Sequence, residues 1–159
     1  MLKSFFLILL LFYQKGPLTF DANNHLCFSY NDSFIIITKD SILSSVSGKE
    51  WSSANHDINF DDFQKKTVTI NNEVYIISDG LGKVYKLSKD ENLEYKLTRI
   101  DNTVNWRSHF KSFLFNFNDE IYSLGGYGFY SYKKELLKFN NVSKEWDLVD
   151  DNYFNSPIG

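Results

Sequence analysis

The chain has 159 residues, of which 43% are hydrophobic and 18% aromatic, a composition that suits one globular domain rich in β-structure. A formal charge of −3 argues against a nucleic-acid partner, because such binders usually carry a basic stripe. The single cysteine, Cys27, excludes an intrachain disulfide and is predicted to be a buried free thiol. The three histidines lack short metal-ligand spacing, so we expect neither a metal nor a cofactor.

The first twenty residues contain a short apolar run. Lys3 supplies a positive charge, residues 5–13 are continuously apolar, and a polar segment ending at Pro17 follows. The run is shorter than the roughly 20 residues that span a bilayer, and it matches the apolar region of a signal peptide. We therefore expect residues 1–20 to be an export signal and the protein to be secreted, cell-surface or periplasmic. A first buried strand or an uncleaved anchor is the alternative.

Beyond this segment, short alternating runs separated by Asn, Asp, Gly, Ser and Lys predict β-strands, and no stretch shows sustained helical periodicity. The predicted strands fall into three groups of four within residues 21–159. The first group, 25–57, has strands at 26–30, 34–38, 42–45 and 50–53; the second, 66–101, at 67–70, 74–78, 83–87 and 95–100; the third, 111–150, at 112–117, 120–124, 135–139 and 146–149.

The groups are copies of one unit. Glu73-Val74-Tyr75 recurs as Glu120-Ile121-Tyr122, and each triplet follows a polar turn and leads into a glycine turn. Four strands per 40–50 residues is the pattern of a propeller blade. The sequence therefore predicts an all-β fold, a partial β-propeller of about three four-stranded antiparallel blades.

The third copy resembles a kelch repeat. It has Gly125-Gly126 after the second strand, a downstream tyrosine and Trp146 in the fourth strand, with an arginine and a histidine just upstream. The second copy follows this pattern poorly, with Asp79-Gly80 in place of the glycine pair. The first copy resembles a degenerate Asp-box repeat of sialidase-like propellers over residues 44–51, with Val46 where the aspartate belongs. Both resemblances imply a β-propeller.

Five residues are expected to serve the fold. Gly80, Gly125 and Gly126 should provide the positive φ angles of the turn between second and third strands. Trp51 and Trp146 open fourth strands and are expected to bury their rings between neighbouring blades.

Three blades are fewer than the four to eight that close a propeller. Two readings follow. The chain is a fragment, in which residues 151–159 lead towards a further blade, or it is a homo-oligomer, in which two chains would form a six-bladed ring.

Alternating strand direction places the connections between blades and the turns between second and third strands at one face. Loops on a rigid scaffold are where binding residues concentrate, and aromatic rings there suit sugars or peptides. The candidate ligand-binding residues are Trp106, Arg107, His109, Tyr127, Phe129, Tyr130 and Tyr132. We expect a non-catalytic binding module for a protein or glycan ligand.

The alternative is part of a glycan-processing enzyme, sialidase-like or other, whose catalytic residues lie outside this chain. Asp57, Asp61 and Asp62 give no carboxylate pair of defined spacing, and two arginines are too few for a sialidase site. The sequence predicts no catalytic residue in this chain.

Overall fold

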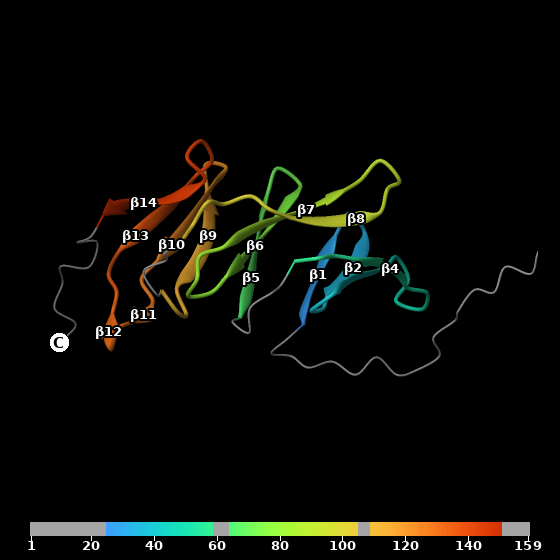
Figure 1. Ribbon diagram of the computed structural model, residues 1–159, viewed down its shortest axis with the longest axis horizontal. Helices are drawn as coiled ribbons and strands as arrows, with labels where there is room; N and C mark the ends of the chain where they lie inside the picture. Colours follow the sequence, from blue (N-terminus) through green and yellow to red (C-terminus); the bar gives the residue numbers. More distant parts are fainter. Residues whose placement is uncertain (1–24, 59–63, 105–108, 151–159) are drawn as a thin grey trace, which may run out of the picture.

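A computed structural model describes residues 25–58, 64–104 and 109–150 (Figure 1), and these residues form strands without helices. Three four-stranded antiparallel sheets lie side by side and resemble the blades of a partial propeller. Sheet 1 contains β1 (Leu26–Tyr30), β2 (Ser33–Ile37), β3 (Ser41–Ser45) and β4 (Ser52–Asn55). Sheet 2 contains β5 (Lys65–Ile70), β6 (Glu73–Ser78), β7 (Val84–Lys89) and β8 (Tyr95–Arg99). Sheet 3 contains β9 (Phe113–Phe117), β10 (Glu120–Leu124), β13 (Leu136–Asn140) and β14 (Glu145–Asp150).

The sequence prediction of an all-β fold with three four-stranded units is confirmed. Each of the twelve predicted strands is present, with its ends displaced by no more than two residues. The prediction missed a small hairpin between β10 and β13, formed by β11 (Tyr127–Gly128) and β12 (Ser131–Tyr132).

Two-residue turns fix the register between the first two strands of every sheet. Asn31-Asp32, Asn71-Asn72 and Asn118-Asp119 all adopt positive φ angles, between 47° and 61°. This is the backbone of a type I′ hairpin turn, which Asn and Asp tolerate better than other residues with side chains. The turns therefore place equivalent residues of the three sheets at equivalent positions.

Each sheet has an onward face, turned towards the next sheet in chain order, and a backward face, turned towards the preceding one. The onward face of sheet 1 packs on the backward face of sheet 2, with Ile35 and Ile37 against Val74 and Ile76. The onward face of sheet 2 packs on the backward face of sheet 3 through a second cluster that includes Ile77, Phe139 and Trp146. Sheet 2 is consequently apolar on both faces.

The first strands of sheets 2 and 3 lie close together. β5 contacts β9, and the Asn116 side-chain amide donates a hydrogen bond of 3.1 Å to the Thr69 carbonyl. Figure 1 shows the sheets fanning outward from these first strands. The arrangement follows from strand twist, which separates the outer strands of neighbouring sheets more than the inner ones.

The prediction of a buried thiol at Cys27 is wrong. Cys27 lies on β1 and is exposed. Its side chain belongs to the backward face of sheet 1, as its pairing with Ile36 shows, and no described residue forms a sheet against that face.

Candidate functional site

The β11–β12 hairpin extends from the end of sheet 3 at which β10 ends and β13 begins (Figure 1). It is held at its base by two backbone hydrogen bonds, from Gly125 N–H to the Glu135 carbonyl (2.9 Å) and from Lys133 N–H to the Gly126 carbonyl (2.8 Å). Gly125 and Gly126 have φ angles of 64° and 110°. A Cβ on Gly126 would also lie 3.1 Å from backbone atoms of the 109–110 segment. Glycine is therefore required here by conformation and by close approach of the backbone.

The segment that leads from sheet 2 into sheet 3 is fastened to this hairpin. Phe110 and Tyr127 exchange backbone hydrogen bonds of 3.0 and 2.8 Å. The adjacent His109 ring is fully buried, and its Nε2 lies 2.7 Å from Glu135 Oε2. These contacts join the segment between sheets 2 and 3 to the β11–β12 hairpin and so fix the position of the hairpin relative to sheet 3.

The same segment is fixed to sheet 2. The Phe110 ring occupies the space beside Gly80, where a Cβ would lie 2.1 Å from a ring carbon. The Lys111 N–H donates to Asp79 Oδ2 (2.8 Å), and Lys66 Nζ forms an ion pair with Asp79 Oδ1 at 3.3 Å. The base of the hairpin is therefore connected to two sheets.

The hairpin tip is aromatic and exposed. Phe129 and Tyr130 form its turn with φ angles of 50° and 63°, nearly the angles of the three Asn-containing turns. Their side chains are 74% and 96% exposed. Behind the tip, Tyr127 and Tyr132 pair across the strands with ring centroids 5.4 Å apart in an edge-to-face arrangement. Lys133 Nζ lies 6.0 Å from the Phe129 ring centre.

Bulky aromatic residues rarely adopt positive φ, and doing so carries strain. The tip gains little packing in return, because both rings are largely in solvent. Four aromatic side chains with one lysine beside them form a surface that can stack on sugar rings or hold a peptide. We name Tyr127, Phe129, Tyr130 and Tyr132 the aromatic hairpin surface.

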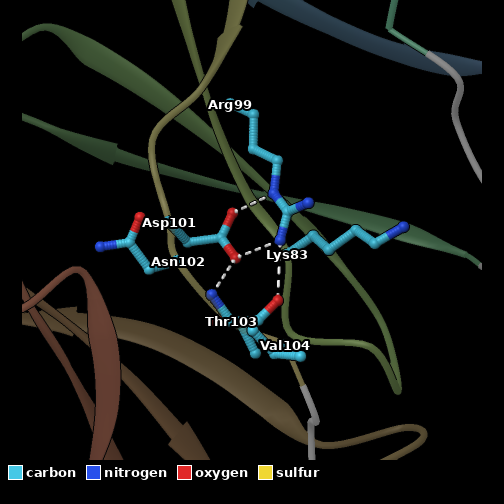
Figure 2. Close-up of a pocket in the computed structure, with 6 residues that line it drawn as sticks. All are labelled: Lys83, Arg99, Asp101, Asn102, Thr103 and Val104. Carbon is cyan, nitrogen blue, oxygen red and sulfur yellow. Dashed lines mark hydrogen bonds and ion pairs between the residues drawn. The ribbon is translucent and has the colours of Figure 1, made fainter.

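A polar depression of about 540 Å³ lies beside the end of β8, where the chain continues from sheet 2 towards sheet 3 (Figure 2). Arg99 Nε and Nη2 each donate to the Asp101 carboxylate at 3.0 Å, and Nη2 also donates to the Thr103 carbonyl at 2.8 Å. Asp101 in addition accepts the Val84 and Thr103 backbone N–H groups at 2.8 and 3.0 Å. Burial alone would raise the pKa of Asp101, but these hydrogen bonds outweigh it and lower the pKa.

The polar groups of this depression stabilise the chain path. Asp101 ties the start of β7 to the segment after β8, and Asn102 N–H donates to the Lys144 carbonyl in the β13–β14 turn (2.8 Å). The lining residues are Lys83, Arg99, Asp101, Asn102, Thr103 and Val104. We interpret the depression as part of the structural contact between sheets 2 and 3.

The candidate residues predicted from sequence separate into three sets. The four residues of the aromatic hairpin surface lie together. His109 lies beneath the hairpin, buried against Glu135, where it can position the loop but offers its ring to no surface ligand. Trp106 and Arg107 lie outside the described residues.

The five residues predicted to serve the fold all lie among the described residues. Gly80, like the glycine pair, has a positive φ, of 81°. Trp146 packs edge-to-face on Phe139 between sheets 2 and 3, and its Nε1 donates to the Gly82 carbonyl at 2.8 Å. Trp51 lies just before β4, and its Nε1 donates to the Gly48 carbonyl of its own loop at 3.2 Å.

The sequence did not predict two residues that hold the hairpin and the neighbouring segment in place. Phe110 and Glu135 lack any motif, because their roles depend on partners far along the chain. The only local signal was the tight glycine at position 80, which indicates that something approaches the backbone closely.

Among the described residues, no group of three or more His, Cys, Asp or Glu side chains is arranged to hold a metal ion. The described part of the chain also has no helix long and apolar enough to cross a membrane. The chain matches no family model and no curated protein.

Proposed function

We propose that this protein is a kelch-like β-propeller segment that acts as a non-catalytic binding module, and that the aromatic hairpin surface holds a protein or glycan ligand. The observation that carries the proposal is the hairpin tip. Phe129 and Tyr130 occupy strained positions while remaining exposed, so their identity is not explained by folding.

The other turns of the chain supply an internal comparison. Where the same φ angles serve only to reverse the chain, the sequence uses Asn-Asn or Asn-Asp. At the β11–β12 turn it uses Phe-Tyr, beside the cross-strand Tyr127–Tyr132 pair. Aromatic rings give large contact area at low entropy cost, and exposed tyrosines are frequent in binding surfaces.

The base of the hairpin favours a binding role over a flexible loop. The backbone bonds of Gly125, Gly126 and Phe110, together with the His109–Glu135 contact, join the hairpin to sheet 3. A preorganised loop loses less entropy on binding, so its aromatic contacts yield more affinity.

The kelch-like assignment rests on the third sheet. Its glycine pair adopts positive φ directly after β10, and Trp146 is the second residue of β14 and packs towards the preceding sheet. The proposal includes export, which is based on the apolar pattern of residues 1–20; these lie outside the described residues. Expression with a tagged C-terminus, followed by N-terminal sequencing of the exported product, tests it: a product retained in the cytoplasm with residue 1 intact would contradict export.

The binding proposal is tested with the full chain against two probe sets, a panel of neutral oligosaccharides and a displayed library of random peptides. Phe129→Asn/Tyr130→Asn copies the Asn71-Asn72 turn and removes the two tip rings. We expect a ligand selected from one panel to bind the unsubstituted chain saturably and to lose at least about tenfold in affinity with this variant.

Leu93→Asn is the matched control. Leu93 is also 74% exposed at positive φ, 63°, but it lies in the β7–β8 turn, at the opposite side of Figure 1 from the hairpin. It should retain full affinity. Equal binding by the hairpin variant, or the same loss with Leu93→Asn, would refute the proposed site; selection of no ligand from either panel would refute the proposed function.

A further inference from the structure

The two outermost faces of the three sheets carry residues of the kind that pack between the sheets elsewhere in the structure. Sheets 1 and 2 meet, and sheets 2 and 3 meet, in each case onward face against backward face. Among the residues that the structure describes, no sheet covers the onward face of sheet 3 or the backward face of sheet 1.

The onward face of sheet 3 is aromatic. Phe113, Phe115 and Phe117 alternate along β9 on the side opposite sheet 2, and Tyr122 stands directly across from Phe115. Ring centroids are 5.7 Å apart for Phe113–Phe115, 5.5 Å for Phe115–Tyr122 and 6.4 Å for Phe117–Tyr122. The rings form a continuous apolar row over the inner half of the sheet.

The positions of these rings are occupied in the other sheets by residues that pack against the next sheet. Register with the second strand makes Phe117 equivalent to Ile70, since they pair with Glu120 and Glu73 respectively. Ile70 is covered by sheet 3 and is 7% exposed, whereas Phe117 is 60% exposed.

A polar group on this face repeats as well. In sheet 2, Glu73 accepts hydrogen bonds from Tyr75 and Lys86, and this group lies on the onward face. In sheet 3 the same contacts recur with Glu120, Tyr122 and Lys138, at 2.9 Å for the tyrosine and 3.2 Å for the lysine. Glu120 and Lys138 are paired within the sheet, so a partner covering the inner half of the face would meet a neutralised pair there. Two further carboxylates of this face, Glu145 and Asp147, lie on the outer strand β14.

The backward face of sheet 1 is the matching half. Phe34 occupies the position of Val74, second in its strand, yet Phe34 is 53% exposed and Val74 is 1% exposed. On the inner strand this face presents Cys27 and Ser29, which are small. At the sheet 1–sheet 2 interface, the inner strand β1 likewise contributes a large residue, Phe28, while the inner strand β5 has small residues, Thr67 and Thr69, on its backward face.

We infer that the onward face of sheet 3 binds the backward face of sheet 1 in a second copy of this chain. The phenylalanine row of β9 then lies over the small side chains of β1, as large and small residues alternate in a packed layer. The positions on the backward face of sheet 1 are Cys27, Ser29, Phe34, Ile36, Ser41, Leu43, Ser45, Ser53 and Asn55, and none is charged. Ile36 and Ser45 are already buried, so the exposed positions of the two inner strands are Cys27, Ser29 and Phe34.

The contact is heterologous, because two different faces meet. It therefore gives a closed ring where the rotation closes and a growing chain of copies where it does not. Two copies provide six sheets, within the four to eight of closed propellers. The inference is independent of the hairpin ligand.

The experiment measures mass by light scattering over a concentration series for the full chain and two variants. Phe117→Glu disables only the sheet 3 face, and Phe34→Glu only the sheet 1 face; both side chains are more than half exposed, so the fold should persist. We expect the unsubstituted chain to give multiples of 18.6 kDa. Each variant should raise the dissociation constant by about thirtyfold or more. Val142→Glu, at a turn outside both faces, is the control and should assemble normally.

Mixing the variants identifies the mode of contact. Phe117→Glu retains a good sheet 1 face and Phe34→Glu a good sheet 3 face, so an equimolar mixture should form a 1:1 dimer that grows no further. Assembly of Phe34→Glu alone at normal strength would instead indicate sheet 3 pairing with itself. That result, or an unsubstituted chain that stays monomeric throughout, would overturn the inference.

Cys27 supplies a second readout that does not depend on mass. It lies on the face to be covered and is the single thiol of the chain. Its reaction with a disulfide reagent should slow as the unsubstituted chain is concentrated and stay fast in Phe117→Glu, whose substitution lies on another sheet. A rate independent of concentration in both proteins would contradict the contact.

Discussion

The strain at the hairpin tip can be measured by exchanging turns within the chain. Phe129→Asn/Tyr130→Asn installs at the β11–β12 turn the pair that the β5–β6 turn uses at φ 48° and 59°, against 50° and 63° at the tip. Asn118→Phe/Asp119→Tyr performs the reverse exchange at the β9–β10 turn, where φ is 48° and 61°. Because the backbone angles match, each exchange changes mainly the side chains.

The expected magnitude follows from the exposed fractions. An ordinary L-residue in the left-handed region costs roughly 1 kcal/mol, a cost that Asn largely avoids, so two replacements gain about 2 kcal/mol. Phe129 buries about a quarter of its side chain, and its loss costs about 0.5 kcal/mol. The exposed Lys133–Phe129 contact adds about 0.5 kcal/mol to that loss. The hairpin variant should therefore be more stable by about 1 kcal/mol, and the reverse exchange less stable by about 2 kcal/mol.

Urea unfolding followed by tryptophan fluorescence is the assay. The midpoint should rise for the hairpin variant and fall for the reverse exchange, with the slope of free energy against urea unchanged in both. A midpoint that falls for Phe129→Asn/Tyr130→Asn would refute the reasoning. It would mean that the two rings support the fold, and that no function outside folding is needed to explain them.

Three further predictions concern the residues that join the sheets. Gly80→Ala should lower the free energy of unfolding by about 2–4 kcal/mol, because its Cβ would overlap the Phe110 ring at positive φ, and adding Phe110→Ala should recover part of that loss in the same urea assay. The pKa of Asp101 is lowered in the folded protein, so its hydrogen bonds to Arg99 and the backbone contribute stability above the unfolded pKa of about 4, and this stability is lost as the pH falls through the folded pKa. Asp101→Asn should therefore flatten the pH dependence of the free energy of unfolding in that range. An unchanged profile would contradict the lowered pKa. Burial, with the hydrogen bond to a neighbouring carboxylate, raises the pKa of Tyr75 to about 12, so the stability present below the unfolded pKa of about 10 is lost as the pH rises between these values; Tyr75→Phe should remove this alkaline decline, measured by unfolding midpoints from pH 9 to 12.

The strands could be predicted because their signals are local. Asn71-Asn72 and its equivalents select a turn that fixes register, and the alternation of apolar residues then decides which side chains face inward. The β11–β12 hairpin lacked such a signal. The sequence placed Phe129 and Tyr130 in the connection between the second and third strands, but because both favour extended backbone it did not mark them as the two-residue turn of a hairpin.

The long-range contacts could not be predicted for a different reason. His109 and Glu135 are 26 residues apart, and only the folded hairpin brings their side chains within 2.7 Å. Cys27 was predicted to be buried on the basis of its residue type, but its exposure depends on what covers the backward face of sheet 1. Periodicity assigns a residue to a face of a sheet and leaves open whether that face has a neighbour.

The tyrosines of sheets 2 and 3 connect these two points. Tyr75 and Tyr122 each donate to a glutamate two residues earlier in the strand, and both have raised pKa values. Burial is the largest cause for Tyr75, which lies beneath sheet 3, whereas the hydrogen bond to Glu120 is the largest cause for Tyr122. The same local chemistry therefore reports whether its face is covered, and a sheet laid on sheet 3 should move the pKa of Tyr122 further upward, towards that of Tyr75. The chain has ten tyrosines, so the signal of Tyr122 is obtained as the difference between the ultraviolet titrations of Tyr75→Phe and Tyr75→Phe/Tyr122→Phe, at concentrations below and above assembly. A Tyr122 pKa that does not respond to concentration would show that the phenylalanine row stays in water.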